Sequence, residues 1–173
     1  MVSSPKLEIN PLNPAQDPSR TLELSRFAVH AYIDTYGYEM DLAQRTVEED
    51  FRAREFTAAS GSDTILVGTI GEQVVGYAQF GHNEGESRGI QEFRKLYVAK
   101  HLHGRGVGPS LMDEALASPD LQSADHIYLW VWGENTRAIR FYEKYGFTTA
   151  SQRQYLGSGG KPTFDVAMLR SRP

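Results

Sequence analysis

Three glycines, at positions 104, 106 and 108, stand where an expected strand meets an expected helix. The strand covers residues 90–98, and apolar residues at helical spacing follow between positions 107 and 115. Glycine adopts the left-handed backbone conformations that a tight turn into a helix requires. The first turn of a helix also leaves N–H groups without partners and carries a partial positive charge. The junction therefore favours an α/β fold with an anion site suited to phosphate.

The glycine pattern alone fits either a phosphate site or a simple tight turn. Pro109 has no N–H to donate, whereas Ser110 has both an N–H and a hydroxyl. The chain contains no GxxxxGK[ST] motif, which excludes a P-loop nucleotide hydrolase. Its glycines also lack the GxGxxG spacing near the N-terminus that is typical of dinucleotide-binding folds.

Hydrophobic periodicity predicts the elements around this junction. Strands are expected at residues 7–12, 63–70, 73–80, 90–98, 127–131, 148–155 and 163–169, and helices at residues 19–36, 41–58, 106–117 and 136–145. Residues 81–89 are expected to form a loop, and the glycine-rich residues 157–160 the turn of the last strand pair. The helix at 41–58 is expected to have a charged outer face, which carries Glu48, Glu49, Asp50, Arg52 and Arg54.

Alternation of strands and helices in the second half of the chain implies a parallel crossover. We therefore predict a single domain over residues 1–173, of mixed α/β class, with a central mixed sheet flanked by helices.

Composition narrows the chemistry. The chain has no cysteine, which excludes disulfides, thiolate metal sites and a cysteine nucleophile. The formal charge of −4 argues against broad nucleic-acid binding and is compatible with a cationic partner. No signal peptide or membrane span is evident, so we expect a cytoplasmic protein without a membrane partner. The five histidines show no metal-ligand spacing, so no metal is expected.

Three segments resemble the GNAT superfamily of N-acetyltransferases: Leu96 to Val98, His103 to Gly108, and Asn135 to Phe147. The loop of that family reads [Q/R]-x-x-G-x-[G/A], and this sequence departs from it only at His103, which stands in place of Gln or Arg. The second motif, N-x-x-A-x-x-F-Y-x-x-x-G-F, is matched fully between Asn135 and Phe147. The resemblance implies an acetyl-CoA-dependent acetyltransferase in which two splayed strands hold the cofactor.

The resemblance also implies which residues bind acetyl-CoA. The pantetheine arm would pair with strand backbone at Leu96, Tyr97 and Val98. The pyrophosphate would lie on the loop formed by His103, Gly104, Arg105, Gly106, Val107 and Gly108, with Ser110 as an additional donor. Asn135 would hydrogen-bond the cofactor arm, and Lys144 or Arg137 would reach the adenosine phosphates, unless these two are ordinary solvated helix charges.

Acetyl transfer to an amine needs a base for the ammonium proton and an acid for the departing thiolate. Glu92 is the candidate base, because a strand places it on the same face as Leu96 and Val98. Its alternative role is a strand glutamate paired with Arg94 or Lys95. The resemblance makes Tyr142 the candidate acid and the Val98 N–H the partner of the thioester carbonyl. Alternatively, Tyr142 is a core residue whose hydroxyl is hydrogen-bonded within the protein. Phe141, which precedes it, is expected to pack into the core. Without cysteine, direct attack in a ternary complex is the simplest route.

The acceptor side is expected near the end of the first helix. Tyr32, Asp34 and Tyr36 interleave aromatic rings with a carboxylate, a combination that can hold a cation, although simple aromatic packing is the alternative. A small-molecule primary amine is the favoured acceptor. A protein acetyltransferase, acting on an N-terminus or a lysine, and a non-catalytic acetyl-CoA-binding module are the alternatives. The oligomeric state is left open, with a homodimer considered.

Overall fold

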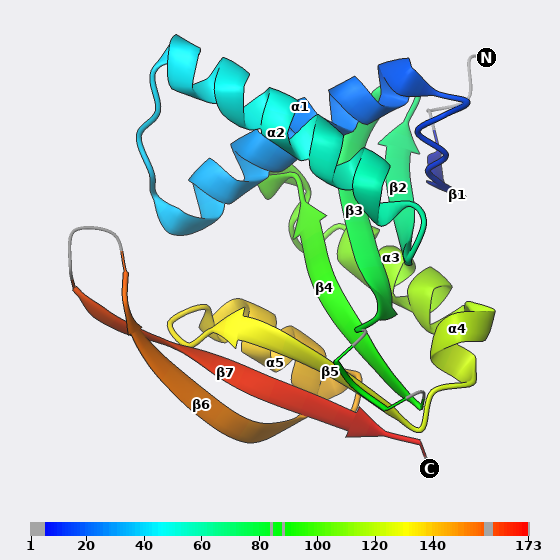
Figure 1. The fold of residues 1–173 in the computed structure, drawn as a ribbon, viewed down its shortest axis with the longest axis vertical. Helices are drawn as coiled ribbons and strands as arrows, with labels where there is room; N and C mark the ends of the chain where they lie inside the picture. Colours follow the sequence, from blue (N-terminus) through cyan, green and yellow to red (C-terminus); the bar gives the residue numbers. More distant parts are fainter. Residues whose placement is uncertain (1–5, 84, 88, 158–160, 173) are drawn as a thin grey trace. The chain divides into compact units, whose positions relative to one another are not determined.

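The computed structural model describes residues 6–83, 85–87, 89–157 and 161–172 (Figure 1). The strands form one seven-stranded sheet in the order β1-β2-β3-β4-β5-β7-β6. Strands β4 and β5 are parallel, and the pairs β1–β2, β2–β3, β5–β7 and β6–β7 are antiparallel. The predicted mixed α/β class with a parallel crossover is therefore confirmed.

The chain divides into two compact units. The first comprises the described parts of residues 1–81 together with residues 95–118, and the second those of residues 82–94 and 119–173. Strand β4 (Ile90–Val98) contributes to both, because the division falls between Arg94 and Lys95. The expectation of a single domain stays a prediction.

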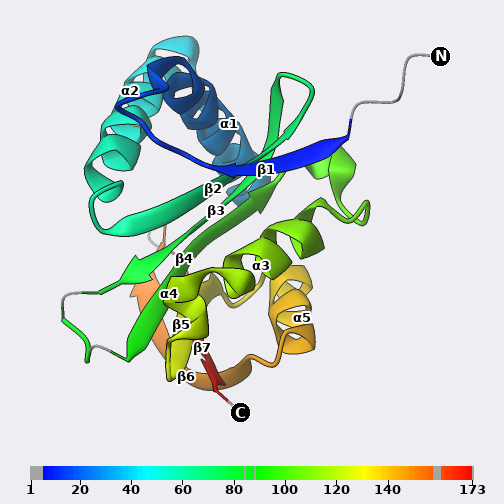
Figure 2. The same ribbon diagram turned by 90° about the vertical axis from the view of Figure 1, so that its right-hand side faces the viewer.

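The first unit packs three helices on its strands. It contains β1 (Leu7–Pro11), α1 (Pro18–Tyr36), α2 (Leu42–Ala59), β2 (Asp63–Ile70), nearly all of β3 (Gln73–His82), η1 (Lys100–Leu102) and α3 (Val107–Ala117). Helices α1 and α2 lie on one side of β2 and β3, and α3 lies on the other (Figure 2). The core between α1, α2 and the strands contains Leu24, Ala28, Phe56, Ile65, Val67, Val74 and Tyr77.

Side-chain caps and one glycine explain this local arrangement. The Asp17 carboxylate accepts from the Arg20 N–H at 2.8 Å and starts α1, and Asp41 forms a capping box with Gln44 at the start of α2. A Cβ at Gly76 would lie 2.9 Å from the Leu111 side chain of α3 and 2.9 Å from the Tyr97 carbonyl oxygen. Gly76 therefore permits α3 to pack closely on β3.

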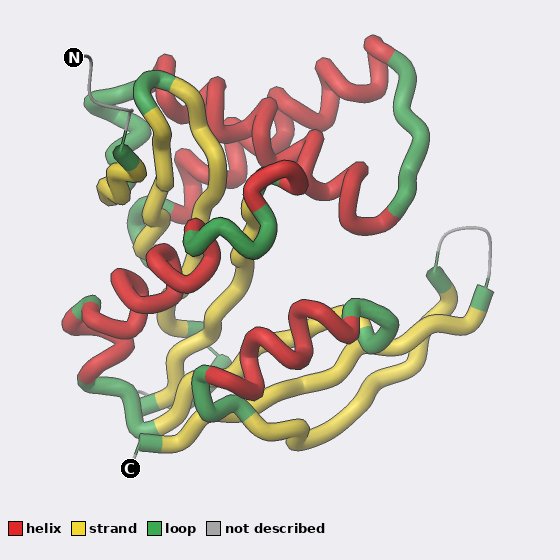
Figure 3. The backbone as a smooth tube through the Cα atoms, turned by 180° about the vertical axis from the view of Figure 1, so that it is seen from behind, coloured by secondary structure: helices red, strands yellow, loops and turns green. Residues whose placement is uncertain are grey.

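The second unit combines a sheet with one covering helix. It contains α4 (Pro119–Gln122), β5 (His126–Trp132), α5 (Thr136–Lys144), β6 (Thr148–Leu156) and β7 (Pro162–Ser171). Figure 3 shows α5 lying across one face of these strands. Along β5, Ile127, Leu129 and Val131 are buried, and the residues between them are only partly buried. This alternation is typical of a strand with one face on the core.

Every predicted strand and helix is confirmed, with bounds that differ from the expected ones by at most two residues. The short helices η1 and α4 were not expected, because each has too few residues to show a periodic pattern. Strand β3 continues to His82, beyond the expected end at Phe80. Residues 158–160 of the expected glycine-rich turn lie outside the described residues. Phe141 is only partly buried, whereas Tyr142 beside it is 8% exposed, so the expectation that Phe141 is the core residue of this pair was wrong.

Candidate functional site

The loop from His103 to Gly108 joins β4 and η1 to α3 in the first unit. Gly104 and Gly106 both have left-handed backbone conformations, with φ of 76° and 89°, and a Cβ at either would meet no atom within 4 Å. Gly106 is the N-cap of α3, and no side chain of the described part of the chain caps it. The predicted conformational role of these glycines is thus confirmed, and the space beside them is open.

The structure also identifies the N–H groups that this loop can offer. Those of His103, Arg105 and Ser110 bond to the carbonyl oxygens of Lys100, Leu102 and Gly106 at 3.2, 3.1 and 3.0 Å. The expectation that Ser110 offers its N–H was therefore wrong, and its hydroxyl remains. The geometry of a helix start leaves the N–H groups of Gly106, Val107 and Gly108 without partners inside α3. Three adjacent donors at the positive end of a helix fit a phosphate group.

The His103 side chain makes a hydrogen bond that the sequence does not predict. Its ring Nε2 lies 2.9 Å from the Val98 carbonyl oxygen, so Nε2 carries the proton and donates. The ring thereby ties the loop to the end of β4. The family's usual glutamine or arginine at this position has other hydrogen-bond donors. The sequence alone could not show whether the His103 ring contacts a phosphate or, as observed, the Val98 carbonyl.

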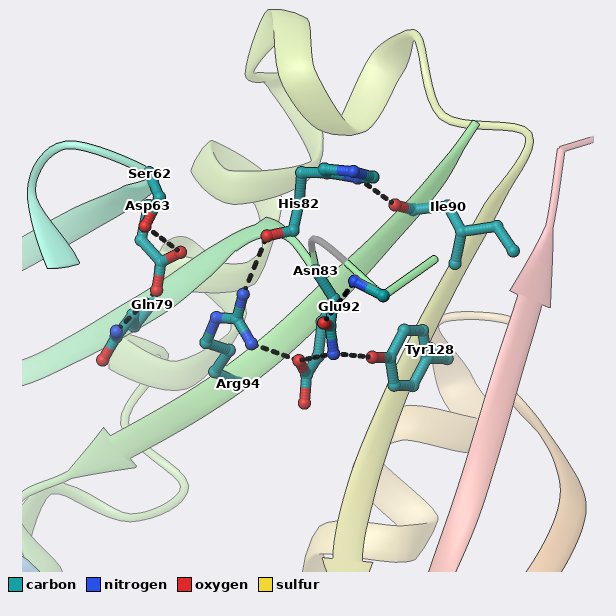
Figure 4. Close-up of polar contacts among 10 residues, drawn as sticks. Ser62, Asp63, Gln79, His82, Asn83, Ile90, Glu92, Arg94 and Tyr128 are labelled. Carbon is teal, nitrogen blue, oxygen red and sulfur yellow. Dashed lines mark hydrogen bonds and ion pairs between the residues drawn. The ribbon is translucent and has the colours of Figure 1, made fainter. Parts of the chain in front are cut away.

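Glu92 lies in a polar cluster on β4 in the second unit (Figure 4). Its Oε2 pairs with the Arg94 guanidinium, whose Nη2 also donates to the His82 carbonyl oxygen at 3.0 Å. The Asn83 amide nitrogen lies 3.4 Å from Glu92 Oε2 and donates to the Tyr128 hydroxyl at 3.0 Å. Burial raises the pKa of Tyr128, and the neighbouring Glu92 adds to the shift. The pairing with Arg94 was one of the two expected arrangements.

The parallel ladder between β4 and β5 is short. It covers the pairs from Ile90 opposite His126 to Glu92 opposite Tyr128. The described ladder thus ends at Glu92, while β4 runs on to Val98 and β5 to Trp132. In the described ladder, Leu96, Tyr97 and Val98 have no β5 partner, which the predicted pairing of a cofactor arm with these residues requires.

Tyr142 and Asn135 belong to α5. The Tyr142 ring packs edge-on against Phe93, Phe141 and Phe147, with centroids 6.4, 5.5 and 5.8 Å away. The Asn135 side chain accepts from the Ala138 N–H at 3.2 Å and so caps the helix. Lys144 and Arg137 are exposed, and Lys144 lies in the last turn, where a cation complements the helix dipole. The Tyr142 ring is thus held in place by packing, as a positioned acid requires.

Of the three residues expected on the acceptor side, two come together and the third lies apart. Tyr32 and Tyr36 lie 4.7 Å apart between ring centroids, and Tyr32 stacks on Tyr38 at 5.3 Å. Asp34 is exposed and lines a cavity of about 780 Å³, beside His30 and Lys100. Asp34 lies apart from the two rings because residues two apart on a helix point in different directions, and the tyrosine–aspartate acceptor site stays a prediction.

A network of charged side chains beside Tyr32 could not be predicted from the sequence. Arg52 lies 5.7 Å above the Tyr32 ring and pairs with Glu48 and Glu55 at 2.9 and 2.8 Å. Lys95 of β4 pairs with Glu55 at 2.5 Å. The Arg52 side chain is only 19% exposed, so the expected charged outer face was wrong for this residue. The Tyr32 ring therefore already contacts a cation supplied by the chain. Burial, followed by Tyr38, raises the pKa of Tyr32 to about 12.

Glu55 is expected to make stability depend on pH. Burial raises its pKa, but Lys95 and Arg52 outweigh that effect and lower it below the ordinary value. The unfolded chain therefore binds the proton more readily, so the stabilisation is present above the unfolded pKa and is lost as the pH falls through the folded pKa. Glu55→Gln should lower the unfolding free energy at pH 7 by about 1–3 kcal/mol, because two cations lose their shared carboxylate.

Urea unfolding of the wild type and Glu55→Gln between pH 7 and pH 3 measures this effect. The variant should show a flatter fall of the unfolding free energy with decreasing pH. Glu49→Gln, on the same helix and with its carboxylate 3.7 Å from Arg26, is the control. Parallel curves for the wild type and Glu55→Gln would contradict the predicted role of Glu55.

Among the described residues, none of the helices combines the length and the apolar character that crossing a membrane requires. Within the same ranges, the histidine, aspartate and glutamate side chains form no group of three or more suited to a metal ion.

The family model described as an acetyltransferase (GNAT) domain matches residues 61–149, just over half of the chain. The chain therefore belongs to the GNAT acetyltransferase family. The match includes the strands β2 to β5, the glycine loop and α5, and thus all the cofactor-binding and catalytic candidates named above.

Individual relatives agree with this family. The chain is similar to an uncharacterised N-acetyltransferase of Mycobacterium bovis, with 35% identity over 106 residues, which cover 61% of this chain and just under two thirds, 65%, of that protein. It is also similar to a probable spermine N(1)-acetyltransferase of Bacillus subtilis subsp. natto, with 26% identity over 89 residues, covering 49% of this chain and 59% of that protein. The paiA N-acetyltransferase of Thermoplasma acidophilum, solved with coenzyme A, shares the fold with a TM-score of 0.67 at 16% identity, covering 96% and 99% of the two chains.

Proposed function

We propose that this protein is an acetyl-CoA-dependent N-acetyltransferase that acetylates a primary amine of a small molecule by direct attack in a ternary complex. Beyond membership of the GNAT family, one observation on this chain supports the proposal. The α3 helix starts without a side-chain cap, behind two left-handed glycines, with open space beside them. The three N–H groups at this start would bind the pyrophosphate of acetyl-CoA, which supplies the acetyl group as an activated thioester.

Several other residues complete the proposed cofactor site. The backbone of Leu96, Tyr97 and Val98 would pair with the pantetheine arm, since the described β4–β5 ladder ends at Glu92. The Ser110 hydroxyl would add a donor to the phosphate site. Asn135 would use its amide nitrogen, since its Oδ1 caps α5. Lys144 would attract the negatively charged end of the cofactor.

Proton transfer is assigned to two residues. A primary alkylamine has a pKa near ~10.4 and is mostly protonated at neutral pH, so a base must take its proton. The Glu92 carboxylate would take that proton, directly or through a water, while Arg94 pairs with its Oε2 and holds it in place. The Tyr142 hydroxyl would hold the proton that the departing thiolate receives, and the Val98 N–H would orient the acyl carbonyl.

A small amine is favoured over a protein acceptor. The relative from Bacillus subtilis subsp. natto is named for spermine, a small polyamine. The acidic formal charge of the chain, −4, is compatible with a cationic acceptor. Both features support a soluble cationic amine as the acceptor.

The test is a panel of acceptors in an assay for the thiol of released CoA. The chain has no cysteine, so a thiol reagent reports only the product. The panel should contain a monoamine, diamines, spermidine, an amino acid and a lysine-containing peptide. We expect a small primary amine to accelerate thiol release well above hydrolysis. Preference for the peptide would favour a protein acetyltransferase, and bound CoA without acceleration by any acceptor would favour a non-catalytic module.

A further inference from the structure

The sheet of the second unit has one face that carries aromatic and charged side chains. Along β5, Trp130 and Trp132 alternate with buried residues and are partly buried. The register places Trp132 opposite Asp165 of β7, and Asp165 opposite Arg153 of β6. Because side chains alternate between the two faces of a sheet, these four residues share one face.

Arg153 lies in a site built for a cation. Its guanidinium carbon is 4.2 Å from the centre of the Trp130 ring. Its Nη2 and Nε lie 2.8 and 3.2 Å from Asp165 Oδ2. The other carboxylate oxygen of Asp165 accepts from the Tyr155 hydroxyl at 3.0 Å, which fixes the carboxylate. An aromatic face and an oriented carboxylate together recognise alkylammonium groups as well as guanidinium.

We infer that Arg153 is a displaceable occupant of this site and that a second ammonium group of the acceptor takes its place on Trp130 and Asp165. The inference rests on the proposed acetyltransferase function, because the first amino group of the same molecule is the one acetylated. The acceptor class is therefore a linear di- or polyamine. Arg153 competes with small monovalent cations for this site. It is displaced by a molecule that is also bound at its reacting end.

The contrast with Arg52 explains why Arg153 can leave. The Arg52 side chain is 19% exposed and pairs with two glutamates, so it is held on several sides. The Arg153 side chain is 56% exposed and pairs with one aspartate, whose own side chain is 14% exposed. Exposed ion pairs contribute little, because water solvates the released charge. When Arg153 swings out, its guanidinium returns to water, and the ordered Asp165 carboxylate stays behind.

The sheet register also sets the spacing between the two ends of the acceptor. Glu92, the proposed base, lies opposite Tyr128. On the same strand, Trp130 is two residues further along and Trp132, opposite Asp165, is four. At about 3.3 Å per residue, the cation site lies roughly 7–13 Å along the strand from the row of Glu92. Such a distance suits the ends of a polyamine such as spermidine better than those of a short diamine.

Binding of spermidine to the CoA-loaded protein, measured by isothermal titration calorimetry, tests the inference without turnover. Asp165→Asn should weaken binding about tenfold, because the charge partner is lost. Arg153→Gln should strengthen binding several-fold, because the competing cation is removed. Arg140→Gln removes the same charge from an exposed position on α5 and should leave binding unchanged. Thermal melts verify that each variant folds, and Tyr155→Phe is a second, milder variant that should weaken binding.

Steady-state kinetics separates this inference from the proposed function. The KM for spermidine should change in the same directions as the binding constants, while the KM for a monoamine stays constant. Weaker spermidine binding in Arg153→Gln would overturn the inference, and so would equal binding in all variants or tighter binding of a lysine-rich peptide. If spermidine binds as predicted but is never acetylated, the cation site stands and the proposed function fails. If monoamines are acetylated while the variants change nothing, the proposed function stands and the cation site fails.

Discussion

Replacing Tyr142 with phenylalanine is expected to lower kcat by about 10²–10⁴-fold, the range typical of losing a positioned general acid. The affinity for CoA and the thermal stability should change little. The ring is 8% exposed and packs against Phe93 and Phe147, and phenylalanine keeps those contacts. Only the hydroxyl is lost, so only the step that needs its proton slows. Steady-state kinetics and CoA titration of the same preparation measure the two effects.

Tyr145→Phe is the matched control for this variant. Tyr145 follows α5 directly, and its ring lies 5.0 Å from that of Phe141, so the change removes a hydroxyl from the same aromatic cluster. The control should keep nearly full kcat. If Tyr142→Phe lowered kcat and CoA affinity by equal factors, or lowered the melting temperature strongly, Tyr142 would have a structural role instead. Unchanged kcat would remove it from the mechanism altogether.

The fold of this chain could be predicted largely from local patterns. Strand β2 was predicted with its observed bounds, because a β-rich run ends at the turn formed by Gly71 and Glu72. Helices α1 and α2 start at Asp17 and Asp41, whose side chains cap the helices as their types suggest. Such signals lie within a few residues of each other, so the sequence contains them directly.

The candidate site was harder to predict from the sequence, because its contacts join residues that are far apart in the chain. The Lys95–Glu55 pair joins β4 to α2, and the stacking of Arg153 on Trp130 joins β6 to β5. Periodicity assigns a residue to a face of its own element but not to a partner on another. The positions in the glycine loop were predictable because their role depends on local backbone conformation, as at Gly106.

Gly106→Val is expected to weaken CoA binding about a hundredfold, since hydrogen bonds to charged groups contribute about 1.5–3 kcal/mol each and at least one would be lost. Gly106 has φ of 89°, a conformation that costs an L-residue about 1–2 kcal/mol. A β-branched side chain is especially disfavoured there, so the loop should move away from its donor geometry. The space beside Gly106 is open, so the valine would also occupy the volume proposed for the pyrophosphate.

Gly71→Val separates the loss of the phosphate site from the general cost of a strained residue. Gly71 has φ of 61°, and a Cβ there would also meet no atom within 4 Å, but it lies in the turn between β2 and β3. Both variants should lose comparable unfolding free energy in urea, since both force a β-branched residue into a left-handed conformation. Only Gly106→Val should lose CoA affinity by calorimetry. Equal CoA affinity in the two variants would show that the α3 start does not bind the pyrophosphate, whereas selective loss at Gly106 would support the donors of Gly106, Val107 and Gly108 as the cofactor site.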